Sequence, residues 1–297
     1  MITDPNRYLD EVLRFQTLDD DGPELTALRT KREEVENFIR DQFASSKISI
    51  RYGGSKAKGT MIRESYDLDL VCYFSSEETN AGETLEEIYT NLSAALKNEY
   101  SVVEKTSALR LSGKDQVYSH VDVVPGRFVE GSNGDVFIYQ KDAEKCRMKT
   151  NLDTHISHIR DSGFNSCIRL MKLWSTRNGI RVKTFVLELM VIDLLNGMKS
   201  ETLENQLVHV LTEIRDDIEN IHVYDPANPS GNDLTSALDS VRSLLKSVAQ
   251  NTLRNIEDDN WENVFGKYEK AHSYSRATLA AAAISTVPLA AKPWARE

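Results

Sequence analysis

Basic residues are scarce relative to acidic ones in this chain of 297 residues. It carries 36 Lys and Arg against 46 Asp and Glu, which gives a formal net charge of −10. A protein that coats nucleic acid needs clustered Lys and Arg to contact phosphates, so this balance argues against that class. Binding of a small nucleotide is compatible with the acidic net charge, because one local basic pocket is enough to bind it. We expect no long nucleic acid as a partner.

Long apolar runs and paired cysteines are also lacking. No window approaches the roughly 18–20 apolar residues that a membrane span needs, and residues 1–15 lack the basic and apolar regions of a signal peptide. The three cysteines, Cys72, Cys146 and Cys167, are odd in number and widely spaced, which is typical of reduced thiols. We therefore expect a cytoplasmic protein with no membrane contact.

A glycine-rich turn interrupts the stretch RYGGSKAKGTMIRESYDLDLVCYF, which covers residues 51–74. The stretch begins as a short strand, breaks at Gly53, Gly54 and Ser55, and returns as a second strand. Glycines let backbone N–H groups approach a ligand closely, and a turn that leads into a helix presents donors to phosphate. The pattern predicts an anion site at this turn.

Two carboxylates, Asp67 and Asp69, lie two residues apart on the returning strand. Alternate side chains of a strand share a face, with Cα atoms about 6.6–6.8 Å apart. Two like charges side by side repel, and a divalent cation offsets the repulsion; oxygen-only ligands suit Mg²⁺ or Mn²⁺. The alternative is that Asp67 caps the strand and Asp69 faces water.

A third carboxylate, Asp122, lies inside the apolar run YSHVDVVP of residues 118–125. Its neighbours Val121 and Val123 require burial on the opposite face of the predicted strand. A buried carboxylate is usually paired or bound to metal. Asp122 is therefore the third candidate ligand.

The apolar periodicity predicts an α+β fold, a twisted mixed sheet with helices on one side followed by a helical lobe. Helices are predicted over residues 4–15, 24–43 and 83–100, strands over 102–111 and 116–124 around a turn at 112–115, and a hairpin over 128–139. Strand signals end near residue 151, where three apolar-periodic helices follow. We assign residues 1–150 to a core, 151–275 to the helical lobe and 276–297 to an Ala- and Pro-containing tail.

The three motifs, in this order, resemble a known signature. Gly54-Ser55, then DLDL twelve residues after the serine, then VDVVP, is similar to the signature of polymerase β-type nucleotidyltransferases. FNSCIRLMKLWS, VKTFVLELM and VYDPANPSGND further resemble the oligoadenylate synthase and cyclic GMP–AMP synthase branch, with its bacterial relatives, the CD-NTases. The resemblance implies the polymerase β-type nucleotidyltransferase core with a helical C-terminal lobe.

The resemblance also implies roles for single residues. Two Mg²⁺ ions, with Mn²⁺ as an alternative, would bind Asp67, Asp69 and Asp122. The nucleotide would contact Gly54 and Ser55 through its β- and γ-phosphates, Lys172 and Thr184 through phosphate, and Phe185 through its base. Thr184 and Phe185 stand where the family commonly has Ser and Tyr, so a tyrosine hydroxyl is lost.

Structural roles compete with these assignments in the helical lobe. Lys172 lies between apolar neighbours and could extend from a helix edge into solvent. Phe185 could as well belong to the core, as an aromatic residue at helical spacing usually does. Glu188 reads as a structural buried acid and not as a catalytic one.

The implied function is a metal-dependent nucleotidyltransferase that joins NTPs, ATP among them, into a cyclic di- or trinucleotide second messenger and releases pyrophosphate. The resemblance implies bacterial antiphage (CBASS-type) signalling. The C-terminal tail is either a disordered end or a peptide recognised by a regulatory protein, as in some relatives. A linear oligonucleotide or RNA-tailing transferase is one alternative. A nucleotide-binding regulator or antitoxin without turnover is the other.

Overall fold

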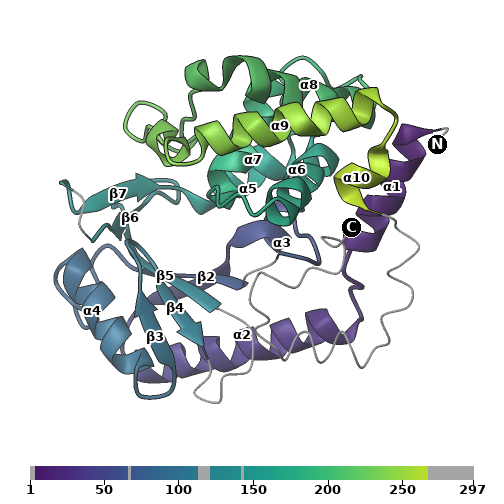
Figure 1. Cartoon of the computed structure of the whole chain (residues 1–297). Coiled ribbons are helices and arrows are strands. Elements are labelled where there is room, and N and C mark those ends of the chain that lie inside the picture. Colours follow the sequence, from purple (N-terminus) through teal and green to yellow (C-terminus); the bar gives the residue numbers. More distant parts are fainter. Residues whose placement is uncertain (1–3, 66–67, 113–120, 142–143, 267–297) are drawn as a thin grey trace. The chain divides into compact units, whose positions relative to one another are not determined.

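The structure is a computed structural model, and it describes residues 4–65, 68–112, 121–141 and 144–266 (Figure 1). The chain divides into two compact units that interleave along the sequence. Of the described residues, the helical unit comprises 4–18, 58–65 and 156–266, and the sheet unit comprises 19–57, 68–112, 121–141 and 144–155. The domain ranges 1–150, 151–275 and 276–297 stay a prediction, and the tail lies outside the described residues.

The sheet unit is built on a mixed sheet whose described strands follow the order β1-β2-β5-β4-β3, with β6 beside β5 and β7 beside β6. The strands β2 and β5 run parallel, and every other described pair runs antiparallel. The bounds are β1 (Ile48–Tyr52), β2 (Leu68–Phe74), β3 (Ser101–Glu104), β4 (Leu109–Ser112), β5 (Val121–Phe128), β6 (Val136–Tyr139) and β7 (Arg147–Thr150).

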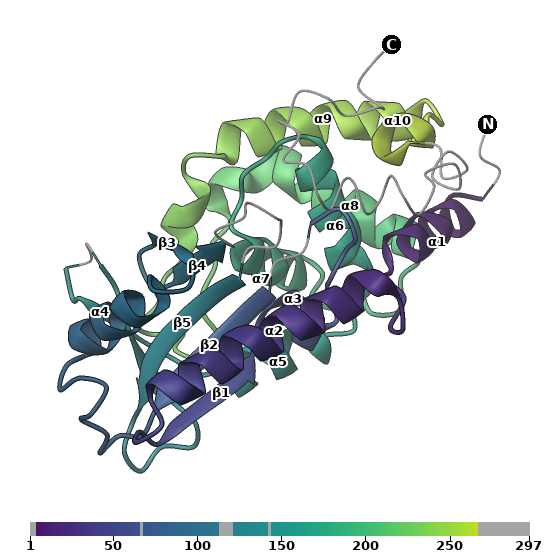
Figure 2. The same cartoon turned by 90° about the horizontal axis from the view of Figure 1, so that it is seen from below.

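One face of this sheet is covered by two helices, α2 (Pro23–Gln42) and α4 (Leu85–Leu96), and Figure 2 shows α2 running alongside β1 and β2. Alternate side chains of β2 and β5 pack against these helices: Leu68, Leu70, Cys72, Phe74, Val121 and Val123. The prediction of a mixed sheet with helices on one side is thus confirmed. Asp69 lies on the opposite face, because it alternates with Leu68 and Leu70.

The predicted single strand over residues 102–111 is wrong. The chain turns there, and β3 pairs antiparallel with β4. Within the turn, the backbone N–H of Lys105 donates to the carbonyl of Ala108 at 2.8 Å. Thr106 and Ser107 lie between them, and short hydroxyl residues favour turns by bonding to nearby backbone. The predicted hairpin across residues 128–139 is confirmed by the pairing of β5 with β6, while the predicted turn at 112–115 lies mostly outside the described residues.

The helical unit confirms the predicted helical lobe. Its core is formed by α6, which is buried along most of its length, by α7, which is apolar on nearly all sides, and by the helices around them. Its helices are α1 (Pro5–Gln16), α6 (Asn165–Arg177), α7 (Thr184–Leu194), α8 (Leu203–Asp217), α9 (Arg242–Glu257) and α10 (Trp261–Phe265). Two short helices, α3 (Gly54–Lys58) and α5 (Leu152–Arg160), begin in the sheet unit and end in the helical unit. None of the helices in the described part of the chain has the length and apolarity to cross a membrane.

Tyr8 links two segments of the helical unit that are far apart in the sequence, because α1 lies beside α10 (Figure 1). The Tyr8 hydroxyl lies 2.7 Å from the carbonyl oxygen of Gly266 and 3.2 Å from that of Trp261. The two aromatic rings also contact each other, with centroids 6.4 Å apart. One buried hydroxyl therefore links α1 to both ends of α10.

Replacing Tyr8 with Phe should lower the free energy of unfolding by about 1–3 kcal/mol, because the ring stays in place while the hydrogen bonding of the hydroxyl to the carbonyls of α10 and Gly266 is lost. Urea unfolding followed by circular dichroism measures the change. Tyr224→Phe is the control: its side chain is 47% exposed, so its effect should stay within about 0.5 kcal/mol. Equal effects of the two substitutions would contradict the assignment.

Candidate active site

Two of the predicted ligands, Asp69 and Asp122, are register partners on the parallel strands β2 and β5. Neighbouring strands lie about 4.7–4.9 Å apart. Both residues occupy the sheet face opposite α2 and α4, because the residues on either side of each one pack into the core beneath those helices. The fold therefore brings together two carboxylates that are distant in the sequence.

Asp122 is held by two basic side chains that the sequence did not single out. Arg110 lies opposite it on β4 and contacts both carboxylate oxygens at 2.8 Å, through Nε to Oδ1 and Nη2 to Oδ2. Lys105 donates to Oδ2 at 2.9 Å. Burial raises the pKa of Asp122, but the hydrogen bonds from Arg110 and Lys105 outweigh it and leave that pKa below its usual range. The carboxylate is thus kept charged.

The glycine turn lies directly against Asp69. The N–H of Gly53 donates to the backbone carbonyl of Asp69 at 3.0 Å. Gly54 has a φ of +74°, and a Cβ at this position would lie 2.0 Å from Asp69 Oδ2. Only glycine fits there, for its backbone conformation and for the space. Ser55, in the first turn of α3, is buried.

Carboxylate oxygens are the ligands that a hard divalent cation prefers, and the register brings two carboxylates together here, with both Asp122 oxygens also accepting hydrogen bonds from Arg110 and Lys105. The third predicted ligand, Asp67, lies outside the described residues. Across the ranges that the structure describes, no group of three or more His, Cys, Asp and Glu side chains is close enough to hold a metal. Two metals bound by three aspartates therefore stay a prediction.

The predicted nucleotide contacts of the helical unit lie near Glu188 and Lys58. Lys172 is 4% exposed, and its Nζ donates to the carbonyl of Thr60 at 2.7 Å. Phe185 is half-buried against the core, with Lys58 Nζ 5.4 Å from its ring centroid. Thr184 is exposed at the start of α7. The predicted contacts of Lys172, Thr184 and Phe185 with a nucleotide stay predictions.

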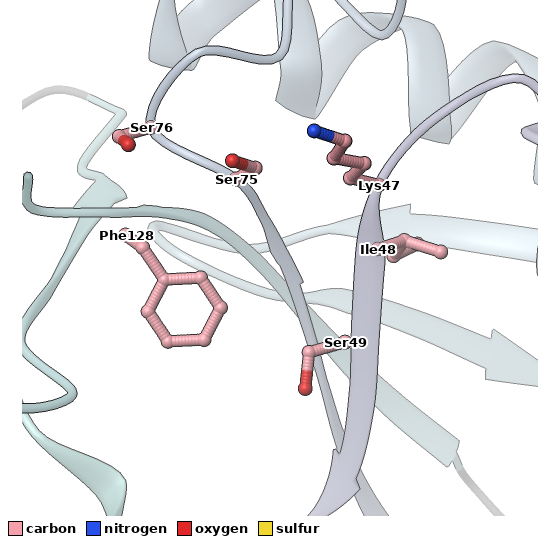
Figure 3. A pocket seen from close by; sticks show the side chains of 6 residues that line it. All are labelled: Lys47, Ile48, Ser49, Ser75, Ser76 and Phe128. Carbon is pink, nitrogen blue, oxygen red and sulfur yellow. The ribbon is translucent and has the colours of Figure 1, made fainter.

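A cavity of about 340 Å³ lies elsewhere in the sheet unit. Figure 3 shows the Phe128 ring on one side and Lys47 and Ile48 on the other. Ser75 follows the last residue of β2, whereas Asp69 is near its start. At about 3.3 Å per residue, these two positions are about 20 Å apart along the strand. The cavity is therefore separate from the carboxylate pair.

Comparisons with known proteins bear on the domain and on the fold. Residues 32–124 match the family model described as Nucleotidyltransferase domain. The matched range contains the glycine turn and all three aspartates. A comparison with curated proteins gives no match. The predicted nucleotidyltransferase is confirmed at the level of this domain.

Solved structures share the fold at low sequence identity. CdnC of E. coli MS115-1 with ATP is 19% identical with a TM-score of 0.66, over 87% of this chain and 98% of that one; it has also been solved with HORMA-deltaN. The CD-NTase CdnG of Bradyrhizobium diazoefficiens with GTP is 14% identical with a TM-score of 0.67, over 89% and 96%. The CdnE cyclic dinucleotide synthase of Elizabethkingia meningoseptica is 16% identical with a TM-score of 0.63, over 86% and 99%. The predicted polymerase β-type fold with a helical C-terminal lobe, as in CD-NTases, is confirmed.

Proposed function

We propose that this protein joins NTPs into a cyclic di- or trinucleotide and releases pyrophosphate. The observation that carries the proposal is the register of Asp69 with Asp122, next to a glycine turn that lies against Asp69. This combination places a carboxylate pair beside backbone that a phosphate can approach closely. It lies within the residues that match the nucleotidyltransferase domain.

The chain's own residues would take the following parts. Gly54 and Ser55 bind the β- and γ-phosphates of the nucleotide that is attacked. Asp69 and Asp122, with Asp67, hold Mg²⁺ or Mn²⁺. Asp122 also accepts the proton of the attacking ribose hydroxyl. Phe185 and Thr184 contact the base and a phosphate, as the resemblance implies.

The metal ions, when bound, supply activation of the attacking hydroxyl and neutralisation of the departing pyrophosphate. Arg110 and Lys105 contact the same Asp122 oxygens that would ligate an ion. They keep that carboxylate oriented and charged before an ion arrives. Further transfers on the linear intermediate, one for a dinucleotide and two for a trinucleotide, close the ring.

The setting of the reaction follows from the same resemblance. We propose ATP or GTP among the substrates, since the similar structures of CdnC and CdnG contain them. We further propose that a regulatory protein recognises residues 276–297. The protein would act in antiphage signalling and lie in the cytoplasm. CdnC has been solved with HORMA-deltaN, which supports a protein partner in this fold.

The test is incubation of the purified protein with each pair of NTPs in Mg²⁺ or Mn²⁺, with products identified by mass spectrometry. A cyclic product should resist phosphatase. Its synthesis should release one pyrophosphate for every nucleotide joined. Chelation of the metal with EDTA should abolish the product, and added Mg²⁺ should restore it. A phosphatase-sensitive ladder would identify a linear transferase instead, and bound NTP without any pyrophosphate would identify a regulator.

A further inference from the structure

A fully buried carboxylate, Glu188 of α7, is surrounded by donors within the helical unit. Its Oε2 accepts from Lys58 Nζ at 2.5 Å, and its Oε1 accepts from the Thr60 hydroxyl at 2.5 Å. Lys172 Nζ lies 3.8 Å from Oε1 and donates to the Thr60 carbonyl. Two lysines and one carboxylate thus share one buried network.

Buried ion pairs often contribute little net stability. Removing charged groups from water costs several kcal/mol for each ion. Replacing a buried ion pair with apolar side chains of similar volume often leaves the protein equally stable. Within this network Lys58 is only 8% exposed and Glu188 is 0% exposed, so the cost applies to both. The network therefore needs a role other than stability of the core.

The contacts share one target, the short segment of residues 58–60. Glu188 holds the side chains of Lys58 and Thr60, and Lys172 holds the Thr60 carbonyl. Asn165 of α6 donates to the Lys58 carbonyl at 3.0 Å. Both the backbone and the side chains of this segment are therefore attached to α6 and α7.

This segment is continuous with the glycine turn. Lys58 is the last residue of α3, and Gly54 is its first. A helix of five residues is little more than one turn, so the position of its last residue constrains the direction of its first. We infer that Glu188 is a positioning residue: it holds the end of α3 through Lys58 and Thr60 and thereby fixes the turn at Gly54 and Ser55.

The structural part of this inference is independent of the reaction, and its effect on nucleotide affinity rests on the proposed function. The first test is hydrogen exchange of the full-length protein without nucleotide, measured by mass spectrometry. In Glu188→Gln, exchange in peptides covering residues 54–60 should rise about tenfold or more, while exchange in α9 stays at the wild-type rate. The control Glu257→Gln changes an exposed glutamate at the end of α9 and should alter neither region.

A second variant keeps the test decisive if Glu188→Gln misfolds. Lys58→Met leaves Glu188 with Lys172 and Thr60, so the carboxylate keeps a counter-charge, but the tie to α3 is lost. It should raise exchange over residues 54–60 as Glu188→Gln does, whereas Lys58→Arg, which keeps the charge and reach, should restore it. Unchanged exchange in Lys58→Met, or an equal rise in α9, would overturn the inference even if Glu188→Gln does not fold.

The second readout is kinetic. Lys58→Met should raise the KM for NTP about tenfold or more with a smaller change in kcat, because it loosens the turn that would bind the phosphates and replaces no residue of the carboxylate pair. An equal loss in kcat with unchanged KM would overturn the positioning role. A wild-type protein that releases no pyrophosphate would refute the proposed function alone, since the exchange result still decides the inference.

Discussion

Asp69→Asn should lower the rate of pyrophosphate release from NTPs by about a thousandfold or more. The substitution keeps the size of the side chain and removes the negative charge that would hold a divalent cation. It also leaves Asp122 as the single described carboxylate of the pair, already contacted by Arg110 and Lys105. Pyrophosphate release in Mg²⁺, measured with a coupled phosphate assay, checks the result.

Asp41→Asn is the matched control for this experiment. Asp41 is an exposed aspartate near the end of α2, the helix that covers the other face of the sheet. Its replacement should leave the rate at the wild-type value. Circular dichroism of both variants should show wild-type spectra and melting temperatures. Full activity of Asp69→Asn would refute the assignment of this carboxylate pair as the active site.

Gly54→Ala should lower activity by about a hundredfold or more, because a misplacement of about 1 Å at a reacting site has that effect. The added methyl group would lie 2.0 Å from Asp69 Oδ2, so the carboxylate or the turn has to move. The positive φ of +74° adds about 1–2 kcal/mol of backbone strain for alanine. Steady-state kinetics with NTP and Mg²⁺ measures the loss.

Gly131→Ala separates the two effects. Gly131 has a φ of +68°, close to that of Gly54, but a Cβ there would meet nothing within 4 Å. Gly131→Ala should therefore show the loss of stability from strain with wild-type activity. If Gly54→Ala behaved like Gly131→Ala, contact between the turn and Asp69 would have no part in the reaction.

The sequence predicted the fold where local pattern decides it. Leu68 and Leu70 alternate with Asp69, which was enough to place the aspartate on the sheet face away from the core. The turn was predicted from its consecutive glycines, which few other structures accommodate. The helical lobe was predicted from the apolar periodicity after residue 151. The two short strands between residues 101 and 112 were merged into one, because a β-rich run does not show where a turn of Thr106 and Ser107 interrupts it.

The partners of the acidic side chains could not be predicted in the same way. Arg110 meets Asp122 only through the register of β4 with β5, and register depends on turn geometry that the sequence leaves open. Lys58 and Glu188 are far apart in the chain and are joined by tertiary packing. Lys56 and Lys58 lie on either side of Ala57, but nothing in the local sequence indicates which acid either lysine contacts.

The parallel pairing of β2 with β5 has a consequence for synthesis of the protein on the ribosome. Asp69 leaves the exit tunnel well before Asp122, since β5 begins at Val121 and the β3–β4 hairpin lies between the two strands. Until β5 emerges, β2 has only β1 as a neighbour and presents an unpaired backbone edge. A nascent chain shorter than this point has the residues of its glycine turn but not the strand pairing that brings Asp69 and Asp122 together, so the carboxylate pair forms only after the central strand of the sheet is inserted.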